Sequence, residues 1–240
     1  MDEASRGAAL DELVRRVIVP YACVGVILIG LGFMIRYSSL PEIDTEHESK
    51  EVADANAGKT AVFQFPQLVL GAVAIFLHIG TQIISIDTII SYANSMDIGL
   101  LEAKVFPAYT LGATITGYLL GIILIPRFIS QLNVLRICTL LGSTLTLLIV
   151  FADTEVRFLG HTANISIWFL AMLGIANSLV WPGIWPLALD GLGKYTKVGA
   201  SILIMGLIAN AIMPLVYGHF ADVYGNRQAY WVLFPCYLFL

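Results

Sequence analysis

Long uncharged apolar stretches recur along this chain, and short charged segments separate them. Four stretches lack Asp, Glu, Lys and Arg altogether: those between Lys59 and Asp87, between Arg136 and Asp153, between Arg157 and Asp190, and between Lys197 and Asp222. A helix needs about 20 mostly apolar residues to cross the hydrocarbon core of a bilayer, and only helices and closed barrels satisfy their backbone hydrogen bonds there. The pattern therefore predicts an all-α polytopic membrane protein.

The same pattern predicts six helices and the beginning of a seventh. Their approximate ranges are 17–33, 65–93, 106–126, 137–151, 165–189 and 199–220, and the seventh begins near residue 230. Because the chain stops at Leu240, we expect that last helix to be truncated and the chain to be a fragment. The predicted domains are a tail with one helix (1–36), an acidic linker (37–64) and a helical bundle (65–240).

Composition excludes several classes of protein. The 240 residues are 58% hydrophobic and 12% charged, whereas soluble domains are about 25% charged, so a water-soluble globule could not cover this much apolar surface. The chain has no strongly basic segment for nucleic acid. Its three Cys are isolated, and the sequence contains neither H-E-x-x-H nor G-x-S-x-G. We therefore expect no enzyme, no cofactor, no metal site and no nucleic-acid partner.

Loop charges indicate an orientation. If the acidic linker is cytoplasmic, the inside loops carry seven basic residues: Arg36, Lys50, Lys59, Arg127, Arg136, Lys194 and Lys197. The outside loops then carry three: Lys104, Arg157 and Arg227. This excess agrees with the positive-inside rule, although adding the three Arg of the N-terminal tail to the outside gives seven against six. We expect the linker to be cytoplasmic.

The helix at 65–93 carries the densest set of polar residues at membrane depth. These are His78, Thr81, Gln82, Ser85, Thr88 and Tyr92. At 100° per residue they fall within about a third of the helix circumference. Because an unsatisfied polar group in hydrocarbon is unfavourable, this stripe should face a solute-lined cavity or hydrogen-bond to a neighbouring helix.

Asp87 is the only acid inside any of these apolar stretches, and an intramembrane carboxylate indicates a functional site. It is a candidate for coupling to a cation, with a structural role as the alternative. The helical wheel places it nearly opposite Gln82. Either the helix breaks near Ser85, or Asp87 faces a different neighbour from the polar stripe.

A second set of candidates lies in the helix at 165–189. Asn177, Ser178, Trp181 and Trp185 share one face, and Pro182 and Pro186 interrupt the hydrogen-bond ladder. Indole rings beside an amide suit a sugar, whose C–H faces pack on aromatic rings while its hydroxyls need donors and acceptors. The alternative for the two Trp is an interfacial aromatic belt. Asn210 and Tyr109, in neighbouring helices, are weaker candidates of the same kind.

Gly117 and Gly121 form a G-x-x-x-G in the helix at 106–126. Small residues at this spacing allow the backbones of two helices to approach closely. We expect this face to pack against another helix.

Several motifs carry a resemblance to a known family. They are Ile79-Gly-Thr-Gln82, Ser85-Ile-Asp87-Thr-Ile-Ile-Ser-Tyr92, Tyr109-Thr-Leu-Gly112, Ile125-Pro-Arg-Phe-Ile-Ser-Gln131, Asn177-Ser-Leu-Val-Trp-Pro-Gly-Ile-Trp185 and Leu187-Ala-Leu-Asp-Gly-Leu-Gly193. With these motifs the chain resembles the C-terminal half of a major facilitator superfamily transporter, and in particular the fucose:proton symporter family and its glucose/galactose transporter branch. The resemblance covers about residue 14 to the end.

The resemblance implies a C-terminal six-helix bundle preceded by the sixth helix of the transporter. It implies a hexose-like sugar as substrate and a proton or sodium ion as coupling cation. The N-terminal half and the lipid bilayer would be its partners, in a cell membrane (the inner membrane of a bacterium). By this resemblance Gln82, Asn177 and Trp181 face the sugar, and the family's coupling acids lie in the other half.

Two other functions stay open. The chain could be a non-transporting membrane sensor or partner subunit that retains the fold, or part of a transporter for an unrelated amphipathic solute. The candidate substrate-binding residues are Gln82, Asn177, Trp181, His78, Trp185 and Asn210, and Asp87 is the candidate for cation coupling.

Overall fold

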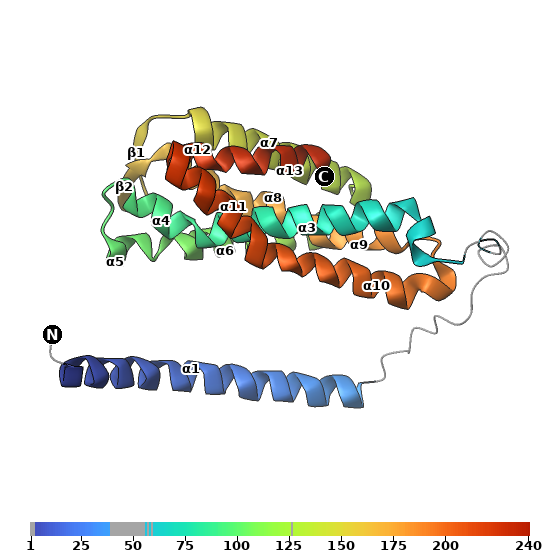
Figure 1. Cartoon of the computed structure of the whole chain (residues 1–240), viewed down its shortest axis with the longest axis horizontal. Coiled ribbons are helices and arrows are strands. Elements are labelled where there is room, and N and C mark those ends of the chain that lie inside the picture. The colour runs from blue at the N-terminus through green and yellow to red at the C-terminus, as the bar shows by residue number, and fades with distance from the viewer. Residues whose placement is uncertain (1–2, 39–55, 57, 59, 126) are drawn as a thin grey trace. The chain divides into compact units, whose positions relative to one another are not determined.

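The computed structural model describes residues 3–38, 56, 58, 60–125 and 127–240. The chain forms two units, Met1–Asp44 and Thr45–Leu240. The first contains α1 (Glu3–Tyr37), of which Val17–Tyr37 is long and apolar enough to span a membrane (Figure 1). Most of the predicted acidic linker, 37–64, lies outside the described residues.

The described residues of the second unit form a helical bundle with one small hairpin. Its longer helices are α3 (Pro66–Asp87), α6 (Phe106–Leu124), α7 (Gln131–Phe151), α8 (Ile165–Ser178), α9 (Val180–Leu189), α10 (Thr196–Met205), α11 (Ala209–Tyr224) and α13 (Leu233–Phe239). Its short helices are η1 (Val62–Gln64), α4 (Ile89–Asn94), α5 (Leu100–Ala103), η2 (Gly193–Tyr195), η3 (Gly206–Ile208), α12 (Asn226–Ala229) and η4 (Tyr230–Val232). The strands are β1 (Glu155–Phe158) and β2 (His161–Asn164).

Six helical stretches of the described residues have the length and composition to cross a membrane. They are Val17–Tyr37, Pro66–Asp87, Leu100–Leu124, Gln131–Phe151, Ile165–Leu189 and Gly193–Tyr224. Each contains or overlaps one of the first six helices predicted from the uncharged stretches, so the prediction of a polytopic helical membrane protein is confirmed. The chain is a multi-pass membrane protein.

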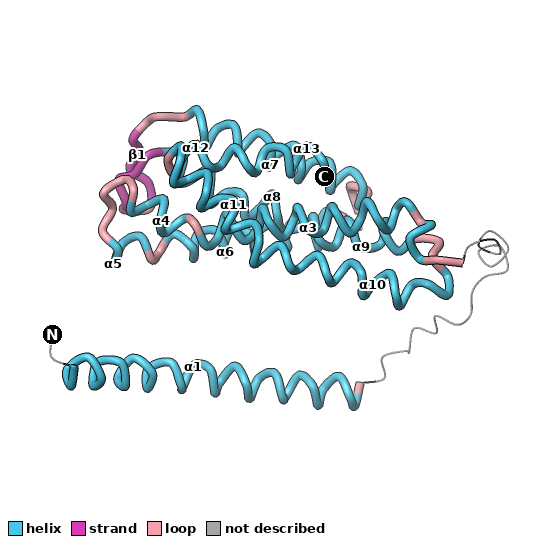
Figure 2. Tube along the Cα trace, in the orientation of Figure 1, coloured by secondary structure: helices cyan, strands magenta, loops and turns pink. Residues whose placement is uncertain are grey.

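The two ends of the bundle differ in their loops. Strands β1 and β2 lie together with α4, α5 and α12 at one end, here called the hairpin end, whereas the chain enters α3 at the other (Figures 1 and 2). The strands are antiparallel and pair Glu155 with Asn164 and Phe158 with His161. The sequence analysis did not predict this hairpin, because two four-residue strands between membrane helices are too short for a clear alternating pattern.

The span Ile165–Leu189 is central to the bundle, since 67% of its most apolar window is buried. Within it, α8 packs against α3, α6 and α7. A Cβ added at Gly117 would overlap the side chain of Ser178, and one at Gly121 would overlap Leu179. The predicted close contact at the G-x-x-x-G is therefore confirmed, and α8 is the helix that it approaches.

Candidate functional site

A buried hydrogen-bond network links α3, α8 and α13 around the amide of Asn177. Oδ1 of Asn177 accepts from the hydroxyl of Tyr237 at 2.9 Å and lies 3.1 Å from Oγ1 of Thr81, and its Nδ2 lies 3.5 Å from Oγ of Ser85. All four side chains are at most 2% exposed. Because an unpaired amide is unfavourable in an apolar interior, this network fixes the three helices relative to one another.

The polar stripe of α3 therefore faces helices of its own bundle over most of its length. Besides the contacts of Thr81 and Ser85, the hydroxyl of Thr88 lies 2.8 Å from that of Tyr230, and the hydroxyl of Tyr92 lies 2.7 Å from Oγ of Ser166. These are interhelical hydrogen bonds, which the sequence analysis gave as the alternative to a solute-lined cavity. Gln82, at the edge of the stripe, is only half-buried.

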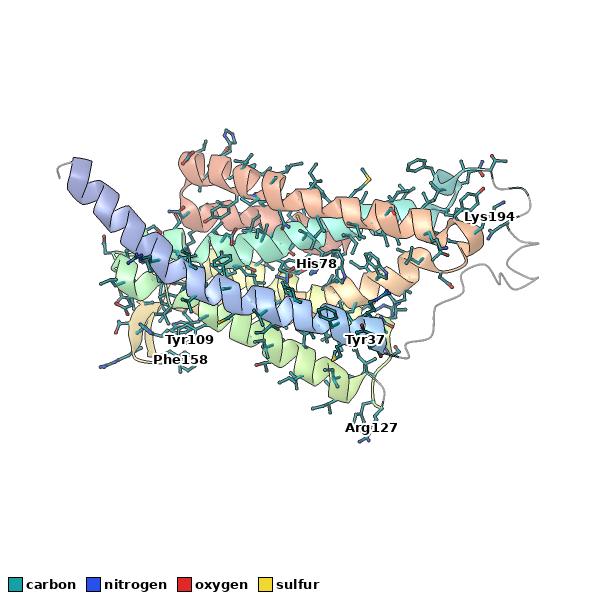
Figure 3. The ribbon with its side chains drawn as sticks, turned by 90° about the horizontal axis from the view of Figure 1, so that it is seen from below. Tyr37, His78, Tyr109, Arg127, Phe158 and Lys194 are labelled. Atoms are coloured by element: carbon teal, nitrogen blue, oxygen red, sulfur yellow. The ribbon has the colours of Figure 1, made fainter. Side chains whose placement is uncertain are left out.

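His78 occupies the same stripe but has a different environment. Its side chain is 1% exposed, and neither ring nitrogen has a hydrogen-bond partner among the described residues. Figure 3 shows His78 between the end of the bundle with Tyr109 and Phe158 and the end with Arg127 and Lys194. A buried unpaired imidazole calls for a partner that the protein chain does not supply, such as a water molecule or a ligand.

The long helix predicted at 165–189 is divided into α8 and α9 at Leu179. Pro182 and Pro186 lie just after this break, and each removes one backbone N–H from the ladder. The carbonyl of Pro182 would normally accept from residue 186, which has no N–H, and Nε2 of Gln131 donates to it instead at 2.6 Å. A side chain of α7 thus completes the backbone hydrogen bonding of α9.

The break separates the residues that the sequence analysis placed on one face. Asn177 ends up inside the bundle, while Trp181 and Trp185 stack on each other with ring centroids 5.3 Å apart and planes 25° apart. Both indoles are half-buried, so each keeps some surface open. They form an aromatic platform on α9.

Two further candidates, Asn210 and Asp87, are exposed. Asn210, near the start of α11, lies on the surface of the bundle. Asp87, the last residue of α3, is also exposed, whereas Ser85 and Thr88 are buried. The helix predicted at 65–93 is interrupted at Thr88, between α3 and α4, and Asp87 lies just before this interruption, two residues after Ser85. Among the described residues its carboxylate has no hydrogen bond or ion pair.

Sequence reasoning missed Tyr237, which donates to Asn177. Its hydroxyl is the one side-chain oxygen in the apolar segment from Leu233 to Leu240. No periodicity in the sequence links Tyr237 to Asn177, which lies 60 residues earlier in the chain. It also missed the partners of Tyr109, whose hydroxyl lies at the hairpin end, 3.2 Å from His161, which in turn lies 2.5 Å from the carboxylate of Glu102. No group of three or more His, Cys, Asp and Glu suited to a metal ion occurs in the described part of the chain.

Comparison with known proteins places the chain beside sugar transporters. No protein-family model matches it. A glucose/galactose transporter of Brucella abortus is 27% identical over an alignment of 220 positions, which covers 89% of this chain and 50% of that protein. The L-fucose-proton symporter of Escherichia coli is 26% identical over an alignment of 231 positions, which covers 94% of this chain and 50% of that protein.

The fold has a counterpart among solved structures. The crystal structure of the major facilitator superfamily transporter FucP, in the outward conformation, matches with a TM-score of 0.78 and 22% identity. The match covers 100% of this chain and 56% of that one. The chain spans about half the length of the curated relatives it matches. Its fold is that of about half of this transporter, and its sequence is similar to about half of the L-fucose-proton symporter and of the glucose/galactose transporter.

Proposed function

We propose that the chain is the C-terminal half of a sugar:proton symporter of the cell membrane. The observation that carries the proposal is its likeness, over nearly its whole length, to about half of two named sugar transporters. The acidic linker is then cytoplasmic, and the hairpin end faces outward. A proton is the first choice of coupling ion because one relative is named a proton symporter, and a sodium ion is the alternative.

The proposed sugar site lies on α3 and α9. Trp181 and Trp185 offer stacked indole faces to the C–H surface of a hexose, and the half-buried amide of Gln82 offers a donor and an acceptor to its hydroxyls. His78 supplies a further donor and acceptor from within the bundle. Asn210 is a peripheral contact, and the N-terminal half would supply the other wall.

The sequence analysis expected Asn177 to face the sugar, but in this proposal Asn177 does not contact it directly. Its amide is surrounded by Thr81, Ser85 and Tyr237. It therefore acts on the sugar through the position of α3, unless Tyr237 moves away. Asp87 stays a candidate for an accessory contact with the coupling cation, because its carboxylate is exposed at the end of α3.

Transport would proceed by alternating access, in which two bundles rock about a site near the midplane. The helix of the span Ile165–Leu189 is already interrupted between α8 and α9. The span can therefore bend at this point without breaking further backbone hydrogen bonds of a regular helix. This point lies directly before the aromatic platform, so bending there would move the two indoles relative to α3.

Uptake of labelled hexose by cells that co-express this chain with a matching N-terminal half tests the proposal. We expect Trp181→Ala to lower uptake about tenfold, the change that corresponds to about 1.4 kcal/mol, and Gln82→Ala to lower it in the same direction. Trp231→Ala is the matched control, because Trp231 is also partly exposed but packs edge-to-face against Phe151 and Phe234.

Two results would count against the proposal. Normal uptake in both the Trp181→Ala and Gln82→Ala variants would favour a transporter of an unrelated amphipathic solute. Hexose binding without any uptake by the assembled halves would favour a sensor or partner subunit.

A further inference from the structure

A cavity of about 460 Å³ lies at the hairpin end of the bundle. Its wall includes Asp153, Asn226, Arg227 and Gln228, together with the aromatic residues Tyr92 and Tyr224. The volume is within the range of about 300–1,000 Å³ that is typical of small-molecule sites. The residues that line it include none of the proposed sugar contacts on α3 and α9.

Hydrogen bonds fix part of the cavity wall in place. Arg227, from α12, donates from Nη1 to Oδ1 of Asp153 at 2.9 Å and from Nε to the carbonyl of Ile149 at 3.2 Å. It also donates from Nη2 to the carbonyl of Ala152. Asn164, at the end of β2, donates to the same Asp153 oxygen at 2.8 Å. The end of α7, the hairpin and α12 are thus joined without any ligand, so this wall is preorganised.

Other polar atoms of the wall are left available. Within the described part of the chain, Oδ2 of Asp153 and the side-chain amides of Asn226 and Gln228 form no hydrogen bonds. The side chain of Asp153 is 76% exposed, and Tyr224 is 65% exposed. The Arg227 guanidinium beside Asp153 holds the pKa of that carboxyl below its ordinary value of 3.8, so the acid is charged at neutral pH.

We propose that this cavity is a second binding site, which takes a neutral polyhydroxylated molecule of about the size of a monosaccharide. The free carboxylate oxygen accepts from hydroxyl groups, and the two amides both donate and accept. The exposed ring of Tyr224 offers an apolar face to C–H groups. One carboxylate and one guanidinium in contact leave the wall without net charge, so it gives no advantage to an ionic ligand.

The choice of hexoses as the first probes rests on the proposed function, whereas the chemistry of the cavity does not. Saturation-transfer NMR on the purified 240-residue chain in detergent measures binding of D-glucose, D-galactose and L-fucose. The test variants are Tyr224→Ala and Gln228→Ala, since both side chains are exposed and neither forms a hydrogen bond with the described residues. Tyr118→Ala is the matched control, because Tyr118 is 42% exposed on α6 and away from the cavity.

We expect the wild-type chain and Tyr118→Ala to bind at least one hexose, and the two cavity variants to bind it about tenfold more weakly. Gluconate and glucosamine should bind more weakly than glucose, because the site has no net charge to match theirs.

Three results would overturn the second site. They are a chain that binds no hexose, binding that is lost in Trp181→Ala but kept in Tyr224→Ala, and tighter binding of gluconate or glucosamine than of glucose. None of these decides the proposed function, which is tested by uptake through the assembled halves. Conversely, failure of the uptake experiment leaves this binding measurement valid.

Discussion

At the scale of single residues, the polar side chains of this bundle have two kinds of environment. Asn177, Thr81, Ser85 and Tyr237 pair with one another inside the protein, so their polar groups are satisfied before any substrate arrives. Trp181, outside this set, keeps an open surface. The division separates residues that hold the bundle together from residues that can meet a solute.

A double-mutant cycle tests the first group. Tyr237→Phe and Asn177→Ala each break the 2.9 Å hydrogen bond between the two side chains. We expect a coupling free energy of about 0.6 kcal/mol, the average for hydrogen bonds between membrane helices, in detergent unfolding. The cycle of Tyr118→Phe with Asn177→Ala is the control and should give no coupling, because Tyr118 is exposed. Equal coupling in the two cycles would contradict the network.

At the scale of elements, the α8–α9 break is stabilised from outside the helix. Two prolines four residues apart leave the carbonyl of Pro182 without a ladder donor, and Gln131 of α7 donates to it at 2.6 Å. In a membrane a carbonyl without a donor is unfavourable. The break between α8 and α9 is therefore stabilised by α7 as well as by α9.

This arrangement predicts that the effect of Gln131→Leu on stability depends on whether residue 186 is a proline. Gln131→Leu should destabilise the wild-type bundle by about 0.5–1.5 kcal/mol, because it removes the hydrogen bond to the exposed carbonyl of Pro182. In a Pro186→Ala background residue 186 regains its N–H, so the same substitution should be nearly neutral. Thermal unfolding of the four proteins in detergent measures the difference. If Gln131→Leu lowers the stability equally in both backgrounds, the hydrogen bond from Gln131 to the carbonyl of Pro182 is not the cause of the loss.

At the scale of the whole molecule, the membrane spans follow from the sequence because charge is excluded from hydrocarbon. Charge-free stretches such as 158–189 and 198–221 therefore give the positions of helices directly. The prolines at 182 and 186 indicate an interruption, but the helix breaks earlier, at Leu179. Helix periodicity likewise identifies the stripe on α3 without identifying its partners.

The partners of the stripe depend on contacts between distant segments. Asn177 meets Thr81, and Tyr230 meets Thr88, across 96 and 142 residues. The cavity at the hairpin end likewise joins α4, the loop after α7, β2 and α12. Such contacts follow from how the helices pack, and the spacing of residues in one sequence does not specify packing.

The central claim is that this chain supplies one half of a sugar:proton symporter, and sugar-induced proton movement tests it most directly. Cells that co-express the chain with a matching N-terminal half are placed in weakly buffered medium, and the external pH is recorded when glucose, galactose or fucose is added. The account predicts that the medium becomes more alkaline for the assembled halves, that neither half alone causes this change, and that Trp181→Ala reduces it about tenfold. Sugar uptake by the assembled halves without any change in external pH, or uptake by this chain alone, would contradict it.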